Sequence, residues 1–304
     1  MDRGAALHRI RHATGFIAAL DQSGGSTPRA LENYGIAKGS WTSDAEMFEL
    51  VHQMRSRIVT SPAFGGDKIL AAILFERTLE TPVADQPITR LLDRKGIASF
   101  LKIDEGLADE SNGVQAMKPI TRLDHKFRLA HDHGVCGTKA RSLILSANDR
   151  GIRAVVDQQF CLAAQVAGDG LIPIVEPEVS LKAPCREEAE RMLLDTLAHA
   201  LDDWRGNIPV VLKLSPPVVP DTYAGLVDHP KVARVAALSG GFDRARACRE
   251  LAKNHGMIAS FSRALLEDLR VSMSDTAFDA ALARAIDEIH AASFTKTELG
   301  EVSA

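Results

Sequence analysis

Short apolar runs alternate with longer amphipathic segments along the whole chain, and this alternation limits the folds that the sequence can adopt. Runs rich in Val, Ile and Leu are typical of strands buried on both faces of a parallel sheet, and the segments between them are typical of covering helices. The eight runs are 16–20, 69–75, 100–103, 135–137, 171–175, 208–214, 232–238 and 257–261. Eight units in 304 residues give about 38 residues each, which suits a closed barrel. We therefore predict an α/β fold, a single (β/α)8 TIM barrel.

Three amphipathic segments show the helical period most clearly. In 43–61, apolar residues recur every three to four positions, and Ser43 followed by Glu46 forms a capping box. Segment 187–204 carries a leucine-rich stripe, and 274–292 begins at Ser274, a favourable N-cap. Segments 78–95 and 104–118 are polar, so we expect long loops there. An open, doubly wound sheet is the alternative fold, but no GxGxxG sequence follows the first run.

No low-complexity segment or flexible linker divides the chain, so we expect one domain over residues 1–304. Residues 1–14 precede the first run and are expected to form a short helical extension. Residues 295–304 are expected to form a frayed tail, because a polar terminus has little to hold it.

Charge and composition argue against several classes of protein. The net charge is −4, whereas nucleic-acid binders usually carry an excess of basic residues. No apolar run approaches the ~18 residues of a membrane span, and the apolar stretch 15–20 is too short for a signal peptide. The four cysteines are scattered, without a CxxC pair, as is typical of reduced thiols. We expect a cytoplasmic protein that binds neither nucleic acid nor membranes.

Charged and small polar residues gather where the predicted strands end. In a TIM barrel, catalytic groups lie at these carboxyl ends and in the loops that follow them. Alternate residues of a strand share a face, so we expect these side chains to converge at one mouth. Burying so many charged groups without ion-pair partners or a function would cost folding free energy. The residues are Asp21, Lys102, Asp104, Lys139, Arg141, Glu176, Glu178, Lys213, Ser239 and Arg263.

Lys213 is the candidate nucleophile, because apolar residues flank it in the run 208–214. Burial and a second cation both favour the neutral form of a lysine, and a neutral amine attacks a carbonyl to form a Schiff base. We interpret Lys139 as that second cation. Glu176 is the candidate general acid and base for dehydration of the carbinolamine, and Asp21 is the candidate base that takes a hydroxyl proton during C–C cleavage.

Two turns rich in serine and glycine predict anion binding. The Ser-Gly-Gly turn at 239–241 opens the helix after the seventh run, where backbone N–H groups can cradle a phosphate. Arg263 follows the eighth run and would add a bidentate contact, at a place that barrel phosphate sites favour. The loop 21–26 is the second such turn. Two anion cradles beside a lysine predict a substrate with a phosphate at each end.

The sequence does not predict a metal site. His131 and His133 are two positions apart on a predicted helix, so their rings diverge. His8 and His12 are one helical turn apart but lack further ligands, and the cysteines lack metal-ligand spacing. We therefore expect neither a metal nor a cofactor.

At these residues the chain resembles class I fructose-1,6-bisphosphate aldolase, most closely the short bacterial form. The matching segments keep the family's order and cover nearly the whole chain. They are FIAALDQSGGSTP (16–28), FLKIDEG (100–106), GTKAR (137–141), PIVEPE (173–178), VLKL (211–214), LSGG (238–241) and ASFSR (259–263).

The resemblance implies a (β/α)8 barrel and an aldehyde-lyase of glycolysis and gluconeogenesis that needs no metal and no cofactor. Such an enzyme reversibly cleaves fructose 1,6-bisphosphate into dihydroxyacetone phosphate and glyceraldehyde 3-phosphate, so its partners are a sugar bisphosphate and triose phosphates. The resemblance also implies a homo-oligomer.

The resemblance implies roles for individual residues as well. Lys213 would form the Schiff base and Glu176 would shuttle protons. The assisting groups would be Asp21, Lys139 and Glu178. One phosphate site would consist of Ser239, Gly240, Ser262 and Arg263. The other phosphate end would be bound by Ser23, Ser26, Lys102 and Arg141.

Two features depart from the larger, animal-type members. Their arginine in the helix after the first strand aligns with Ala30, and the neighbouring Arg29 would point about 100° away on a helix. Their terminal tyrosine is missing, since the only tyrosines are Tyr34 and Tyr223. The sequence therefore leaves open which group protonates the enamine.

Two other functions fit the same pattern in part. Another Schiff-base lyase or a transaldolase would keep Lys213 but lose at least one phosphate site. A barrel that serves only as a binding or scaffold protein would have no reason to keep Asp21, Lys139, Glu176 and Lys213 at one mouth.

Overall fold

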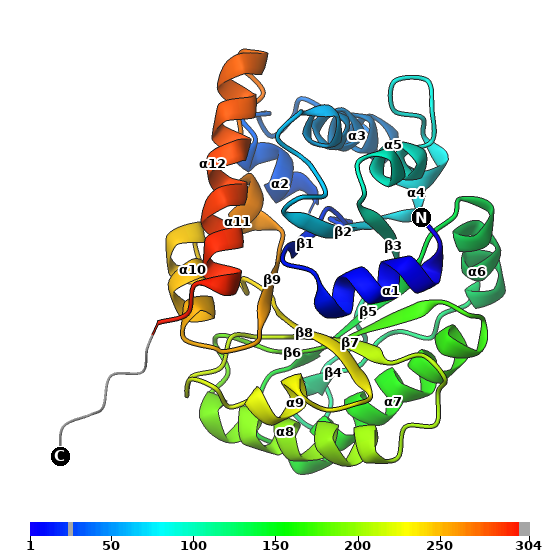
Figure 1. Ribbon diagram of the computed structural model, residues 1–304, viewed down its shortest axis with the longest axis vertical. Coiled ribbons are helices and arrows are strands. Elements are labelled where there is room, and N and C mark those ends of the chain that lie inside the picture. Colours follow the sequence, from blue (N-terminus) through cyan, green and yellow to red (C-terminus); the bar gives the residue numbers. More distant parts are fainter. Residues whose placement is uncertain (24–26, 298–304) are drawn as a thin grey trace.

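The eight expected strands form a closed parallel barrel in the computed structural model, which describes residues 1–23 and 27–297 (Figure 1). The ring is complete because β9 pairs with β1 and β3 pairs with β5, both in parallel. The prediction of an α/β fold with a (β/α)8 TIM barrel is confirmed. The barrel strands are β1 (Phe16–Ala19), β2 (Ile69–Leu74), β3 (Ala98–Lys102), β5 (Gly137–Ile144), β6 (Ile172–Val179), β7 (Val210–Leu214), β8 (Val232–Ala237) and β9 (Ile258–Phe261).

Helices surround the barrel, and the long ones pack their apolar faces on its outer side (Figure 1). They are α1 (Arg3–His12), α2 (Thr27–Asn33), α3 (Asp44–Thr60), α4 (Glu76–Glu80), α5 (Ile88–Arg94), α6 (Leu123–Asp132), α7 (Asp149–Gly168), α8 (Arg186–Asp202), α9 (Ala224–Val227), α10 (Arg244–Ala252), α11 (Arg263–Leu266) and α12 (Asp275–Phe294).

Helix α1 closes the end of the barrel at which the strands begin. Its residues Ala6 and Ile10 are completely buried and belong to the apolar cluster inside the barrel, with Ile17 and Leu70. The other end of the barrel, where the strands finish, is therefore the end that remains open. Of the expected C-terminal tail, residues 298–304 lie outside the described residues, and Thr297 donates its backbone N–H to the carbonyl of Ala252 at the end of α10.

Two segments expected as loops contain regular structure. Residues 78–95 include α5, whose Ile88 and Leu92 are buried one turn apart. Residues 104–118 include the short strand β4 (Val114–Gln115), which pairs with β5 in antiparallel orientation. The expectation of long loops is wrong for these residues, because a seven-residue helix and a two-residue strand carry too few apolar residues to show a period.

Strands β5 and β6 extend well beyond the apolar runs that predicted them. Strand β5 continues to Ile144 and β6 to Val179, so both include charged residues near the barrel mouth. Ion pairs among these residues replace apolar burial. The hydrophobic pattern therefore predicts ends for β5 and β6 that lie too early in the sequence.

The two predicted caps are present. The hydroxyl of Ser43 accepts the N–H of Glu46, and that of Ser274 accepts the N–H of Ala277. The capping box is displaced by one residue, because the Glu46 carboxylate accepts the backbone N–H of Thr42 at 2.6 Å. Both serines thus fix the first turn of a long helix.

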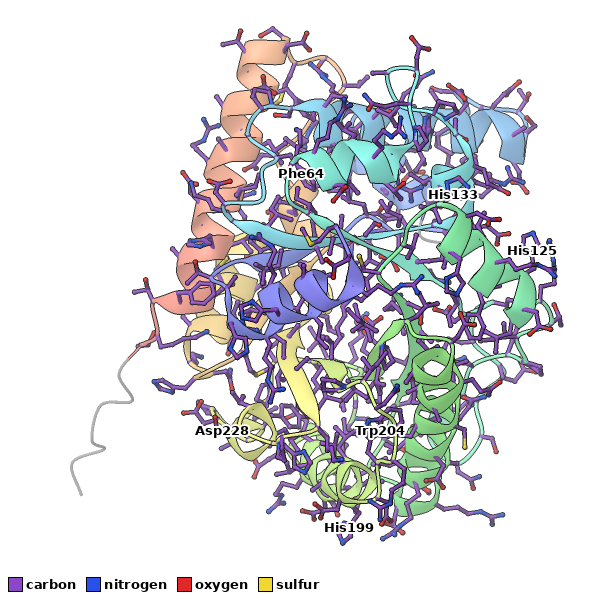
Figure 2. The ribbon with its side chains drawn as sticks, turned by 45° about the vertical axis from the view of Figure 1, so that its right-hand side comes forward. Phe64, His125, His133, His199, Trp204 and Asp228 are labelled. Atoms are coloured by element: carbon purple, nitrogen blue, oxygen red, sulfur yellow. The ribbon has the colours of Figure 1, made fainter. Side chains whose placement is uncertain are left out.

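The core has two layers, one inside the barrel and one between the strands and the helices. In the outer layer, the ring of Trp204 packs edge-on against Phe160, with 5.7 Å between ring centroids. Polar side chains such as His199 and Asp228 lie at the periphery (Figure 2). No helix within residues 1–23 and 27–297 is both long and apolar enough to cross a membrane.

Candidate active site

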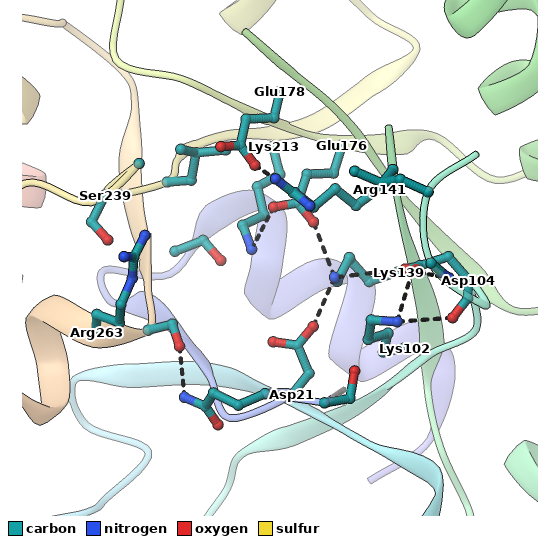
Figure 3. A pocket seen from close by; sticks show the side chains of 18 of the residues that line it. Asp21, Lys102, Asp104, Lys139, Arg141, Glu176, Glu178, Lys213, Ser239 and Arg263 are labelled. Atoms are coloured by element: carbon teal, nitrogen blue, oxygen red, sulfur yellow. Dashed lines mark hydrogen bonds and ion pairs between the residues drawn. The ribbon is translucent and has the colours of Figure 1, made fainter. Parts of the chain in front are cut away.

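A cavity of about 610 Å³ opens at the carboxyl ends of the barrel strands (Figure 3). It brings together the residues predicted for the site, except Ser26, which lies outside the described residues. The predicted residues that line it are Asp21, Ser23, Lys102, Lys139, Arg141, Glu176, Glu178, Lys213, Ser239, Gly240, Ser262 and Arg263.

Alternation along the strands carries the charged side chains into this cavity. Ile174 of β6 and Val211 of β7 belong to the apolar cluster inside the barrel. Two residues further along the same faces, Glu176 and Lys213 line the cavity. The barrel interior therefore changes from apolar to charged at the end where the strands finish.

Lys139 lies at the centre of the charged side chains and is only 3% exposed. Its Nζ lies 2.7 Å from Asp21 Oδ2, 3.1 Å from Glu176 Oε2 and 3.9 Å from Asp104 Oδ2. Burial alone would lower the pKa of Lys139, but the three carboxylates outweigh burial and raise the pKa well above its usual range. Lys139 is therefore a cation throughout the neutral pH range.

Lys213 contacts the same carboxylate from the other side. Its Nζ lies 2.9 Å from Glu176 Oε1, and it is 5% exposed. Glu176 thus stands between the Nζ atoms of Lys213 and Lys139, with one oxygen toward each (Figure 3). The sequence interpretation placed Lys139 beside Lys213 as a second cation. In the structure Lys139 instead forms ion pairs with three carboxylates.

Asp21 and Asp104 are buried and ionised. Burial would raise the pKa of Asp21, but the charges of Lys139 and Lys213 hold it well below its usual range. Burial likewise opposes ionisation of Asp104, and Lys139 and Lys102 together lower its pKa. The two carboxylates are consequently acceptors only, each aimed at a lysine.

Asp104 had no role assigned from the sequence, although it was noted at the end of the third run. Lys102 of β3 and Lys139 of β5 stand directly opposite each other in the parallel ladder, an arrangement that like charges make unfavourable. Asp104 separates them, since its Oδ1 accepts Lys102 Nζ at 2.6 Å and its Oδ2 faces Lys139. The strand register, which the sequence does not show, supplies the reason for this residue.

The two predicted phosphate-binding ends of the cavity differ in whether their basic side chains are already paired with carboxylates. At one end, Lys102 is paired with Asp104, and Arg141 Nε lies 2.5 Å from Glu178 Oε2. At the other end, Arg263 is exposed, and its side chain forms no hydrogen bond or ion pair with any described residue. The Arg263 end is therefore ready to receive an anion without breaking an internal pair.

Gly240 allows the turn beside Arg263 to form. Its φ is +58°, and a Cβ at this position would lie 2.6 Å from a methyl group of Leu181. A larger residue would meet both backbone strain and a clash. The turn thus leaves its backbone exposed toward the cavity, together with Ser239.

Other residues of the cavity were not predicted. Arg29 lines it together with Ala30, so the expectation that Arg29 points away is wrong. Gln22 also lines the cavity, and its only sequence signal was its place next to Asp21 in the segment 16–28.

The histidines singled out in the sequence have structural partners or no ligands nearby. His131 contacts Arg3 Nη2 at 2.8 Å and Asp169 Oδ2 at 2.7 Å. The rings of His8 and His12 lie 4.8 Å apart, tilted by 50°. Within residues 1–23 and 27–297, no group of three or more His, Cys, Asp or Glu side chains is arranged to hold a metal ion.

The fold and the cavity together define a TIM barrel with a charged site at the carboxyl ends of its strands. A structure of fructose-bisphosphate aldolase from Plasmodium falciparum, in complex with TRAP and a small-molecule inhibitor, is similar with a TM-score of 0.81 at 19% sequence identity, over 98% of this chain and 95% of that chain. Cgl0159 from Corynebacterium glutamicum is similar with a TM-score of 0.56 at 13% identity, over 96% of this chain and 92% of that chain. No protein-family profile matches the sequence. At these identities the similarity establishes the fold alone.

Proposed function

We propose that the protein is a class I fructose-bisphosphate aldolase, which reversibly cleaves fructose 1,6-bisphosphate into dihydroxyacetone phosphate and glyceraldehyde 3-phosphate through a Schiff base on Lys213. The observation that carries the proposal is the carboxylate of Glu176, which contacts both Lys213 and Lys139 inside the cavity. Buried groups of this kind are costly, and a binding protein has no use for them.

Glu176 is placed to transfer protons during Schiff-base formation. Its Oε1 is within hydrogen-bond distance of Lys213 Nζ and accepts a proton from it. The neutral amine attacks the C2 carbonyl of the substrate and gives a carbinolamine. Glu176 then returns the proton to the carbinolamine hydroxyl, which leaves as water, and an iminium ion remains on Lys213.

Asp21 and Lys139 serve the C–C cleavage. The ionised Asp21 accepts the proton of the C4 hydroxyl, the C3–C4 bond breaks, and its electron pair moves into the iminium. Glyceraldehyde 3-phosphate leaves and an enamine remains. Lys139 offsets the negative charge that develops on substrate oxygens. The proton that Asp21 has accepted then reaches C3 of the enamine by way of Glu176 or Glu178, directly or through water, and hydrolysis of the resulting iminium releases dihydroxyacetone phosphate.

The phosphate ends support a bisphosphate substrate. Ser239, Gly240, Ser262 and Arg263 would bind the phosphate next to the carbonyl that reacts with Lys213. Lys102 and Arg141, with Ser23 and Ser26, would bind the other phosphate. Lys102 and Arg141 would then give up part of their contact with Asp104 and Glu178 in favour of the phosphate. We further propose that the enzyme is a cytoplasmic homo-oligomer of glycolysis and gluconeogenesis.

Borohydride trapping tests the proposed function. The protein is incubated with dihydroxyacetone phosphate, reduced with borohydride and digested, and the modified peptide is sequenced. A triose adduct on the peptide that contains Lys213 is expected. A panel of mono- and bisphosphorylated sugars then separates this enzyme from a transaldolase or another Schiff-base lyase, neither of which needs both phosphates.

Removal of metal ions is expected to leave activity unchanged. The iminium withdraws electrons from the bond that breaks, which is the task of a Lewis-acid metal in other mechanisms. Cleavage rates are compared before and after dialysis against EDTA. An activity that EDTA abolishes and zinc restores would contradict the proposed mechanism.

Replacement of Arg263 with alanine is expected to weaken substrate binding selectively. A charge-assisted hydrogen bond to phosphate contributes roughly 1.5–3 kcal/mol, so KM for the bisphosphate should rise about ten-fold or more. Arg284→Ala, an exposed arginine of α12, is the matched control. Equal losses for substrates with and without that phosphate would show that Arg263 is structural.

A further inference from the structure

Arg55 of α3 is buried without an acidic partner. It is 2% exposed, and it forms no ion pair with any residue of 1–23 or 27–297. Burial, only partly offset by the charge of Asp21, lowers the pKa of Arg55 to about 10. A buried guanidinium is costly, so the hydrogen bonds that it makes require an explanation.

The guanidinium joins α4 to the loop after β1. Its Nη1 donates to Thr78 Oγ1 at 2.7 Å, and its Nη2 donates to the backbone carbonyl of Gln22 and, at 3.4 Å, to Gln22 Oε1. Arginine has donors only, so the amide oxygen of Gln22 must face Arg55. The amide NH2 group of Gln22 must therefore point the other way.

That NH2 group meets the hydroxyl of Ser262. Gln22 Nε2 donates to Ser262 Oγ at 2.6 Å, across the space between the loops that follow β1 and β9. Ser262 is the N-cap of α11, but its side chain accepts no helix N–H. Its oxygen already accepts a hydrogen from Gln22, so its own hydrogen is left to be donated elsewhere. Ser262 lines the cavity, so this hydrogen is available to an acceptor there.

We propose that Arg55 and Gln22 form a one-way chain of hydrogen-bond donors that makes Ser262 a donor to an anionic oxygen in the cavity. This inference rests on the proposed function in one respect, since it takes the anion to be a phosphate of the substrate. Arg55 and Gln22 are positioning residues, because they act on that phosphate through Ser262.

Gln22→Glu reverses the direction of the hydrogen bond between positions 22 and 262, and the two side chains have nearly the same shape. A carboxylate only accepts, so Glu at this position would accept from Arg55 and from the Ser262 hydroxyl, whose hydrogen would then turn away from the cavity. We expect binding of inorganic phosphate and KM for the bisphosphate to weaken about ten-fold or more. Turnover and borohydride trapping should change by less than about three-fold.

The new charge also repels phosphate, so the experiment needs a background that lacks the hydroxyl. In Ser262→Ala, the substitution Gln22→Glu retains only the repulsion, and its effect should be at least about five-fold smaller than in the natural chain. Gln165→Glu, on the exposed surface of α7, is the matched control for charge. If Gln22→Glu weakens phosphate binding equally with and without Ser262, the proposal is overturned.

Two further measurements keep the outcome decisive. If Gln22→Glu does not fold, Gln22→Leu replaces it, and its smaller effect on phosphate binding should likewise disappear in Ser262→Ala. Binding of inorganic phosphate, followed as a shift in Tm, requires no catalysis. Coupling between positions 22 and 262 in a protein without aldolase activity would support the donor chain while contradicting the proposed function.

Discussion

Replacement of Lys213 with methionine is expected to abolish cleavage of fructose 1,6-bisphosphate, with a loss on the order of 10⁴-fold or more. Methionine fills a similar volume but cannot form an iminium, and no other group supplies the electron sink. Glu176 keeps its contact with Lys139 at 3.1 Å, so its carboxylate remains paired. The fold should therefore survive, and the loss should appear in kcat.

Cleavage rates and borohydride trapping measure this effect together. Lys118→Met, which alters an exposed lysine, is the matched control and should retain full activity and a trapped adduct. The Lys213 variant should yield no adduct. Recovery of a triose adduct on Lys139 or Lys102 would assign the Schiff base to another lysine and contradict the mechanism.

Replacement of Lys139 with methionine is expected to destabilise the protein by about 3–5 kcal/mol and to remove nearly all activity. The reason is that Asp21, Glu176 and Asp104 all lie within 3.9 Å of Lys139 Nζ. Glu176 and Asp104 each keep a second lysine, whereas Asp21 loses the one ion pair that it forms within the described residues. Removing one partner of a buried ion pair leaves an uncompensated charge, which costs more than the pair contributes. Urea unfolding measures the loss of stability.

The pH dependence of that loss provides the control. In the natural protein the pKa values of Asp21 and Asp104 are lowered, so their ion pairs stabilise the fold above the unfolded pKa near 4, and this stabilisation disappears as the pH falls through the folded values. Without Lys139, burial instead favours protonation of these carboxyl groups. The stability lost in the variant should therefore become smaller as the pH falls from about 7 to about 5. A deficit below about 1 kcal/mol, or one independent of pH, would show that Lys139 is not the centre of the network.

Much of the site follows from local sequence rules. The alternation of apolar runs with helices predicts the barrel, and the two-residue period of a strand predicts that Lys213 and Glu176 continue the inward faces of Val211 and Ile174. These rules need no knowledge of distant contacts. They fail where the chain is locally ambiguous, as in α5 and in the charged ends of β5 and β6.

The sequence by itself determined the type of fold, the end of the barrel that holds the site and most of the residues that line it, because strand period and helix period are local properties of the chain. The tertiary structure decided which side chains form ion pairs and hydrogen bonds with each other. Asp104 has its place because the register of β3 and β5 sets Lys102 opposite Lys139. Gln22 meets Ser262 although 240 positions separate them in the chain, because closure of the barrel sets β1 beside β9. Hydrogen bonds and ion pairs depend on distances of a few ångströms between such remote residues, and only the closed barrel defines those distances.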